Sequence, residues 1–246
     1  MPLYTYRKKT VSLKKKVVNY FSYVSLAAGS LLLFWSFYPI VSFEIYSRLF
    51  IQKKINSPVP RSEIASSLEA ANSVLGSYNV FSSNLRDFTK VSLWFPARPQ
   101  GETLAKLNIK EYSLSIPKIN IRGARVVIGG EDLTKSLIHY MPVSLPGEYG
   151  NVVVFGHSTL PQIYNLKDYK TIFTYLPSLE KGDKITVKVE DNDYEYEVYE
   201  MFVINPDQVS VLDQKTDASY LTLITCVPPG TYWKRLVIRA KLIKLP

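Results

Sequence analysis

The residues best suited to chemistry lie near the C-terminus, where a strand pattern ends at the chain's single cysteine, Cys226. Residues 220–226, YLTLITC, alternate with a period of two, which predicts a strand with two differently occupied faces. The segment VPPG at 227–230 ends this strand, because proline cannot donate to a ladder and glycine tolerates a reversal. A second alternating pattern over 233–242 predicts a hairpin partner. Arg235 would then lie near Cys226, since opposed residues are about 5 Å apart.

A thiol beside a guanidinium has a chemical use. A nearby cation favours the thiolate, or stabilises the oxyanion that forms when the thiol adds to an amide. This chemistry also needs an acid or base, and the chain has two histidines, His139 and His157. His157 is the better candidate because it follows the apolar run VVVFG at 152–156, and side chains at the strand ends of a rigid scaffold make good site residues.

Three motifs stand in order along the second half of the chain: GNVVVFGHST at 150–159, TLITC at 222–226 and KRLVIRA at 234–240. Together they resemble the sortase family of cysteine transpeptidases. The likeness begins at about Tyr112, where LSIPKINI is similar to the family's opening strand, and runs through LPGEYGN at 145–151 to the C-terminus. The resemblance therefore covers a length of chain sufficient for one domain.

The resemblance implies a role for each matching residue. Cys226 would be the nucleophile, His157 the general acid/base, and Arg235 the group that holds the peptide or the oxyanion. Thr225 and Leu223, which belong to the TLxTC motif, would contact the substrate, with Thr225 acting by position rather than by chemistry.

Three other residues near these motifs receive different interpretations. Ser158 departs from the resemblance, because many family members carry arginine after the histidine; that position varies, so the difference concerns the subclass more than the activity. Arg239 shares the parity of Arg235 and is expected to be structural or solvated. His139 is expected on a short helix over 132–140, where a lone histidine is usually structural.

Charge and cysteine content limit the possible partners. The formal net charge of +9 is concentrated in residues 1–16, which hold six basic residues and no acidic one. The other 24 basic residues face 21 acidic ones, too small a surplus for the dense basic face that nucleic acid requires. A single cysteine cannot make an internal disulfide, so Cys226 is either a buried inert thiol or a reactive one, and its context favours the reactive one.

Residues 17–43 carry no charge and are long enough to span a bilayer, which predicts a transmembrane helix. A cleaved signal peptide and a buried core helix are the competing interpretations, but the apolar run continues past the small residues at 27–29. The basic residues 1–16 favour a cytoplasmic N-terminus. We therefore expect a single-pass protein of the plasma membrane, in contact with lipid through this helix, with its catalytic domain extracytoplasmic.

Residues 44–110 are expected to form an extracytoplasmic stalk or pre-domain segment. The motif SPVP at 57–60 breaks the first helix, and a modest amphipathic helix is expected over 61–74. Trp94 and Phe95 form an apolar pair that could dock on the domain. Two interpretations stay open: a spacer of marginal order, or an autoinhibitory lid whose Trp94 or Phe95 occupies the substrate groove.

Residues 111–246 are expected to fold as a mainly β domain. Short strands separated by turns, brief helices and the lack of a βαβ rhythm predict a closed antiparallel β-barrel of the sortase type. The acidic residues Asp191, Asp193 and Glu195 could recruit calcium, but they fit a solvated turn better. No metal site and no cofactor are expected.

As the resemblance implies, Cys226 would attack the amide after threonine in an LPxTG-like sorting peptide, and an amine acceptor on the cell surface would resolve the thioester. This requires Cys226, His157 and Arg235 to meet in a groove that a peptide can enter. Two alternatives remain open. Water could resolve the same intermediate, which gives a cysteine peptidase, or the barrel could be an inactive membrane-anchored module that binds or assembles peptides.

Overall fold

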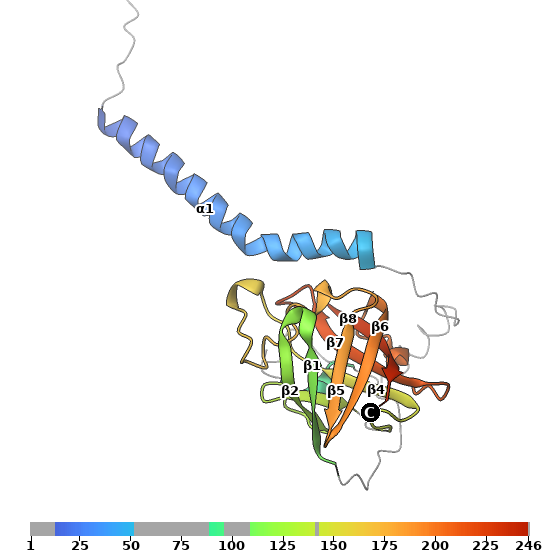
Figure 1. Cartoon of the computed structure of the whole chain (residues 1–246). Coiled ribbons are helices and arrows are strands. Elements are labelled where there is room, and N and C mark those ends of the chain that lie inside the picture. Colours follow the sequence, from blue (N-terminus) through green and yellow to red (C-terminus); the bar gives the residue numbers. More distant parts are fainter. Residues whose placement is uncertain (1–12, 52–88, 96–108, 141–142, 246) are drawn as a thin grey trace, which may run out of the picture. The chain divides into compact units, whose positions relative to one another are not determined.

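The computed structural model describes residues 13–51, 89–95, 109–140 and 143–245. The chain divides into two compact units, Met1–Ser42 and Phe43–Pro246. The first contains most of a long helix and the second contains a β-barrel (Figure 1). The helix expected over 61–74 lies outside the described residues.

The N-terminal helix α1, Leu13–Tyr46, continues as a short π-helix, η1, Ser47–Ile51. It is long and apolar enough to cross a membrane, with a mean hydropathy of 1.7 over its most apolar stretch. At a rise of 1.5 Å per residue, a hydrocarbon core of about 30 Å takes up roughly 20 residues. The span expected at 17–43 lies inside this helix, and both ends of α1 extend beyond it.

Eight strands close into a barrel in the order β1-β2-β3-β4-β7-β8-β6-β5. Figure 1 labels most of these strands. The closed β-barrel predicted from the sequence is confirmed. Most neighbours pair antiparallel, but β2 with β3 and β4 with β7 run parallel. The strands are β1 Glu111–Ile116, β2 Ile121–Ile128, β3 Leu137–Tyr140, β4 Gly150–Phe155, β5 Lys184–Val189, β6 Asn192–Ile204, β7 Ser219–Val227 and β8 Lys234–Lys244.

Short 3-10 helices occupy several of the connections. They are η3 Val91–Leu93, η4 Pro117–Ile119, η5 Pro161–Ile163, η6 Leu176–Ser178 and η7 Val209–Leu212.

Two apolar clusters use opposite faces of the same strands. One cluster fills the barrel interior and includes Val154 of β4 and Leu223 of β7. The other lies on the outer face and includes Phe155 of β4 together with Ile224 and Cys226 of β7. Successive residues of a strand point to opposite faces, so neighbours in sequence belong to different clusters. The outer cluster is the one that contains the cysteine.

The helix expected over 132–140 is wrong, because residues 137–140 form strand β3. Asp132 Oδ1 accepts bonds from the amide and the hydroxyl of Thr134, which makes a turn there rather than a helix cap. β3 pairs with β2 on one side and β4 on the other, and all four of its residues are buried. Long-range pairing therefore overrides the local helical pattern.

Candidate active site

Strands β7 and β8 bring Cys226 and Arg235 together. The strands pair antiparallel, and Cys226 lies directly opposite Arg235. Both residues are buried, with 1% and 2% of their surface exposed. The hairpin and its register, predicted from the alternation of residues on either side of the VPPG turn, are confirmed.

Strand β4 supports His157, which follows two residues after the end of the strand at Phe155. β4 pairs in parallel with β7 up to the pair of Phe155 with Ile224, and the amide of Gly156 donates to the carbonyl of Ile224 at 3.2 Å. A Cβ on Gly156 would lie 2.5 Å from the ring of Phe173, so glycine is required there. The backbone of His157 is thereby held beside the end of β7.

Trp94 covers the site and contacts two of the three predicted catalytic side chains. Its ring centroid lies 5.6 Å from that of His157, and the guanidinium carbon of Arg235 lies 5.2 Å from the Trp94 ring centroid. Its carbonyl accepts a bond from the guanidinium at 3.0 Å. The ring also meets Phe155 edge-on at 5.4 Å. Trp94 is fully buried and Phe95 nearly so.

Backbone bonds tie the covering segment, residues 89–95, to the start of the turn before β3. The amide of Val91 donates to the carbonyl of Glu131 at 3.1 Å, and that of Leu133 donates to the carbonyl of Thr89 at 3.0 Å. A part of the expected stalk, 44–110, therefore packs against the barrel.

Among the residues that the structure describes, Cys226 and His157 do not lie in the open groove that we expected from the sequence, because Cys226 is buried and His157 is only 7% exposed, with the ring of Trp94 against that of His157. The physical cause is the apolar outer face of β4, β7 and β8. Ile224, Val237 and Phe155 would be exposed to water without the cover, and burying large apolar side chains is favourable by roughly 1.5–3 kcal/mol each.

Arg235 is held chiefly by backbone carbonyls. One terminal nitrogen donates to the carbonyls of Tyr232 at 3.0 Å and Lys234 at 3.2 Å, while the other reaches Trp94. Its Nε is buried and has no hydrogen-bond partner among the described residues, and the same is true of His157 Nε2. Buried polar atoms without partners are uncommon, which marks this rim as a place where a further polar group could bind.

Burial sets the charge state of the reactive groups. It raises the pKa of the Cys226 thiol to about 11, against the opposing attraction of Arg235. It lowers the pKa of His157 to about 4, although Asp132 and Asp168 act in the other direction. Removing a group from water disfavours its charged form, which explains both shifts. At neutral pH the covered site therefore holds a neutral thiol and a neutral imidazole.

The two predicted substrate-binding residues have structural surroundings. Leu223 lies in the barrel interior with no exposed surface, because its parity is opposite to that of Cys226; the substrate contact expected of Leu223 is therefore wrong. Thr225 is also fully buried, and its hydroxyl donates to the carbonyl of Gly156 at 2.7 Å. A positioning role for Thr225 is consistent with this bond.

The remaining candidates lie apart from the cluster. Arg239 pairs with Glu200 at 3.2 Å on the β6–β8 side of the barrel. His139 is buried with its ring edge-on to Tyr112 at a centroid distance of 5.8 Å, and burial lowers its pKa to about 4. Both observations agree with the structural roles expected from the sequence.

Sequence reasoning missed the contribution of Ser158. Its hydroxyl donates to the carbonyl of Cys226 at 2.6 Å. The sequence offered one signal for this, a hydroxyl residue directly after the histidine at a strand end, but not the partner 68 positions away.

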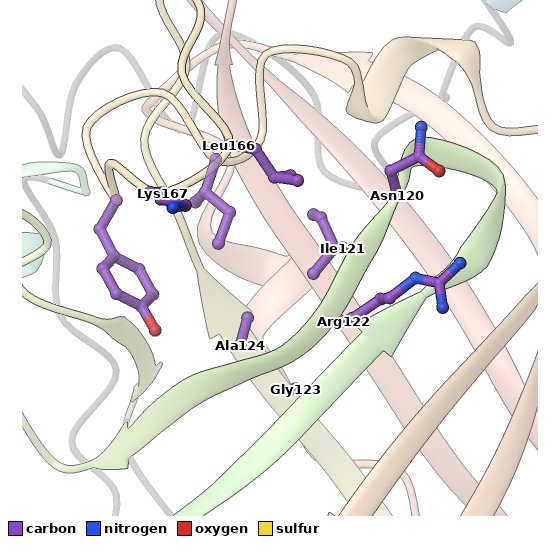
Figure 2. A pocket seen from close by; sticks show the side chains of 9 residues that line it. Asn120, Ile121, Arg122, Gly123, Ala124, Leu166 and Lys167 are labelled. Carbon is purple, nitrogen blue, oxygen red and sulfur yellow. The ribbon is translucent and has the colours of Figure 1, made fainter.

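A cavity of about 560 Å³ is lined by other residues and lies between the start of β2 and the loop that follows His157 (Figure 2). The cavity is lined by Asn120, Ile121, Arg122, Gly123, Ala124, Leu166, Lys167, Tyr169 and Ile172.

Among the described residues, no group of three or more histidine, cysteine or acidic side chains could hold a metal ion.

The fold and the site define a class: a closed β-barrel with a cysteine and an arginine paired across two strands and a histidine at the end of the adjoining strand. The family model described as "Sortase domain" matches residues 114–243, more than half of the chain, and the chain belongs to the sortase family. Outside the matched residues, the chain carries one helix long and apolar enough to cross a membrane among the residues that the structure describes.

The chain is similar to individual proteins over part of its length. The chain is 30% identical over 133 residues to Sortase D of Bacillus subtilis (strain 168), covering 52% of this chain and 61% of the relative. It is 27% identical over 142 residues to Sortase A of Bacillus anthracis, covering 58% and 60%. The chain thus spans about three fifths of the length of these relatives. A solved Clostridium perfringens Sortase D5 transpeptidase shares 26% identity at a TM-score of 0.48, covering 57% of this chain and 84% of that one.

Proposed function

We propose that the protein is a cysteine transpeptidase that cleaves an LPxTG-like sorting signal and transfers the released acyl group to an amine on the cell surface. The observation that carries this proposal is the position of Trp94. The ring of Trp94 contacts both His157 and Arg235, and Arg235 lies opposite Cys226, so one side chain is shared by the surroundings of all three proposed groups.

In the proposed reaction, the sulfur of Cys226 adds to the carbonyl carbon of the threonine in the sorting signal. The carbon–nitrogen bond then breaks, and the thiol proton passes through His157 to the leaving amine. The acceptor amine attacks the resulting thioester, the new amide forms, and its proton returns to the sulfur. No oxidant, metal or cofactor is consumed.

Arg235 would bind the substrate carbonyl or the oxyanion. In the covered site one of its nitrogens donates to the carbonyl of Trp94, and a peptide carbonyl in the same position would accept the same bond. Its buried Nε is a further donor for an incoming polar group, and the Nε2 of His157 is a further polar atom without a partner among the described residues. For the substrate to bind, the covering segment, residues 89–95, must leave the outer face of the barrel.

A direct test is to incubate the full chain in detergent with a panel of sorting peptides and to measure its intact mass. The expected product is a covalent adduct on Cys226 that disappears when an amine acceptor is added. The acceptor should appear in a new amide product. Cys226→Ala should form no adduct, and His157→Ala should slow acyl transfer by about 10³-fold or more.

The same experiment separates transfer from hydrolysis. A peptidase would release the free acid at a rate that does not depend on the amine, whereas a transpeptidase would give a product ratio that rises with amine concentration. Free acid as the sole product across the acceptor panel would replace the proposal with the hydrolytic alternative.

One observation favours a second candidate, an inactive peptide-binding or assembly module. Cys226 is buried and its pKa is raised to about 11, which describes an inert thiol as well as a covered one. This candidate predicts that Cys226 is alkylated no faster than an ordinary buried thiol in the presence of every sorting peptide. This candidate also predicts that Cys226→Ala binds peptide as tightly as the unaltered chain and leaves the cell's phenotype intact.

A further inference from the structure

The carbonyl of the cysteine residue is bound in an unusual way. Along β7, the carbonyl of Ile224 accepts from the backbone amide of Gly156, which continues the parallel pairing with β4. The carbonyl of Cys226, two residues further on, faces the same neighbour. The side-chain hydroxyl of Ser158 donates to it at 2.6 Å. A side chain thus extends the ladder beyond the last residue of β4.

A second hydroxyl bond runs between the same strand ends in the opposite direction. The hydroxyl of Thr225 donates to the carbonyl of Gly156 at 2.7 Å, and both groups are buried. We call these two bonds, from Ser158 and Thr225, the hydroxyl clasp. They are short, and each leaves a strand-end carbonyl satisfied where water has little access.

The two bonds of the hydroxyl clasp are made by the residues directly before and after His157. Gly156 and Ser158 are the two neighbours of His157, and their partners are Thr225 and Cys226. We propose that Ser158 is a positioning residue of the reaction, which fixes the nucleophile's backbone against the residue next to the acid/base. This inference rests on the proposed function, and it adds a role for a residue outside the resemblance-derived set of Cys226, His157 and Arg235.

A hydroxyl is suited to this place because it is short and can donate. Ser158 is half-buried, and its neighbour Thr159 is itself held, with its amide donating to the hydroxyl of Thr174 at 3.0 Å. The backbone on both sides of the donor is therefore restrained. A shift of about 1 Å between reacting groups can lower a rate by about 10²-fold, so one bond at this position can affect catalysis without contacting substrate.

The test compares Ser158→Ala, Ser158→Thr and a matched control, Ser178→Ala, in the full chain. Ser178 also donates its hydroxyl to a backbone carbonyl, that of Tyr175 at 2.7 Å, but this bond joins residues of an exposed turn outside the site. We expect Ser158→Ala to lower kcat for acyl transfer about tenfold with KM within about twofold. Ser158→Thr should restore most of kcat, and Ser178→Ala should resemble the unaltered chain.

A second readout does not depend on transfer activity. The rate at which iodoacetamide alkylates Cys226 should rise several-fold in Ser158→Ala, because the end of β7 is released, and should stay unchanged in Ser178→Ala. Equal kcat and equal alkylation rates in the two alanine variants would overturn the inference. If the unaltered chain forms no thioester, the proposed function fails, and the alkylation rates alone then decide whether Ser158 positions Cys226.

Discussion

Burial keeps both histidines uncharged at neutral pH, and this can be measured as a dependence of stability on pH. The pKa of His157 and that of His139 are both lowered to about 4, whereas an unfolded histidine titrates near 6.5. Between these values the unfolded chain binds protons that the folded chain does not. Stability should therefore be full above pH 6.5 and should fall as the pH decreases toward 4.

The histidine content of the chain makes this prediction simple to check. Because the sequence has two histidines, the variant His139→Gln/His157→Gln removes every imidazole. We expect the melting temperature of the unaltered chain to fall by several degrees between pH 7 and pH 5, and the double variant to lose most of that slope. Parallel curves for the two proteins would show that neither imidazole is held neutral by burial.

Arg235 should not tolerate replacement by lysine. Its guanidinium donates to three carbonyls, those of Tyr232, Lys234 and Trp94, and an ammonium lacks the planar fork needed to reach them together. We expect Arg235→Lys to lower kcat/KM about 100-fold and to lower the melting temperature. Arg239→Lys is the matched control, since Arg239 belongs to the same strand but pairs with Glu200, and it should change kcat/KM less than about threefold. An equal loss of kcat/KM in Arg235→Lys and Arg239→Lys would contradict a role for Arg235 in the reaction.

The covering segment, residues 89–95, packs on the outer face of the barrel, and we expect it to control access to the thiol of Cys226. Trp94→Ala should open the outer face above Cys226, so that alkylation by iodoacetamide is at least about tenfold faster and the pKa of the thiol moves down from about 11. The matched control is Trp233→Ala, because Trp233 is 64% exposed and should leave the alkylation rate unchanged.

Loss of Trp94 also removes a large buried side chain, which typically costs about 3–5 kcal/mol. The alkylation rates must therefore be compared below the unfolding transition, as judged by circular dichroism. If folded Trp94→Ala reacts as slowly as the unaltered chain, residues 89–95 do not limit access, and the inert-thiol alternative gains support.

The elements differ in how far the sequence could predict them. The hairpin of β7 and β8 was predictable because its strands alternate cleanly and VPPG marks the turn, so the pairing of Cys226 with Arg235 follows from local information. β3 was not, because the four residues LIHY become a strand through pairing with β2 and β4. The parallel pairing of β4 with β7, separated by two other strands in sequence, is likewise a property of barrel closure.

The candidate site shows the same division. The residue types and motifs pointed to Cys226, His157 and Arg235, but the contacts that surround them join distant parts of the chain. The carbonyl of Trp94 lies 141 positions from Arg235, and Ser158 lies 68 positions from Cys226. The apolar pair Trp94 and Phe95 allowed a lid to be one of two interpretations of the segment before the barrel, but its contacts with Arg235 and His157 could not be read from the sequence. The hydroxyl clasp gave no such signal, because single-sequence patterns carry no information about pairs of distant residues.

At the scale of the whole molecule, charge and hydropathy predict how the chain sits in a membrane. Six basic residues precede the uncharged stretch 17–43, which lies within a helix apolar enough to span a bilayer. Basic flanks are retained on the cytoplasmic side. We therefore expect protease added to intact bacterial protoplasts to digest the barrel, residues 111–246, while an epitope at the N-terminus stays protected.

The control for this prediction is to change the charge of the N-terminal residues, because that charge is expected to set the orientation of the chain in the membrane. Replacing the six basic residues of the N-terminus with serine should increase the fraction of chains whose epitope is digested, whereas exchanging lysine and arginine among those positions should leave that fraction unchanged, because the charge is kept. A protected barrel with a digested epitope in the unaltered chain would place the thiol in the cytoplasm. Surface sorting signals would then be out of its reach, and the proposed transfer to a cell-surface amine would be wrong even if the cysteine chemistry were confirmed in detergent.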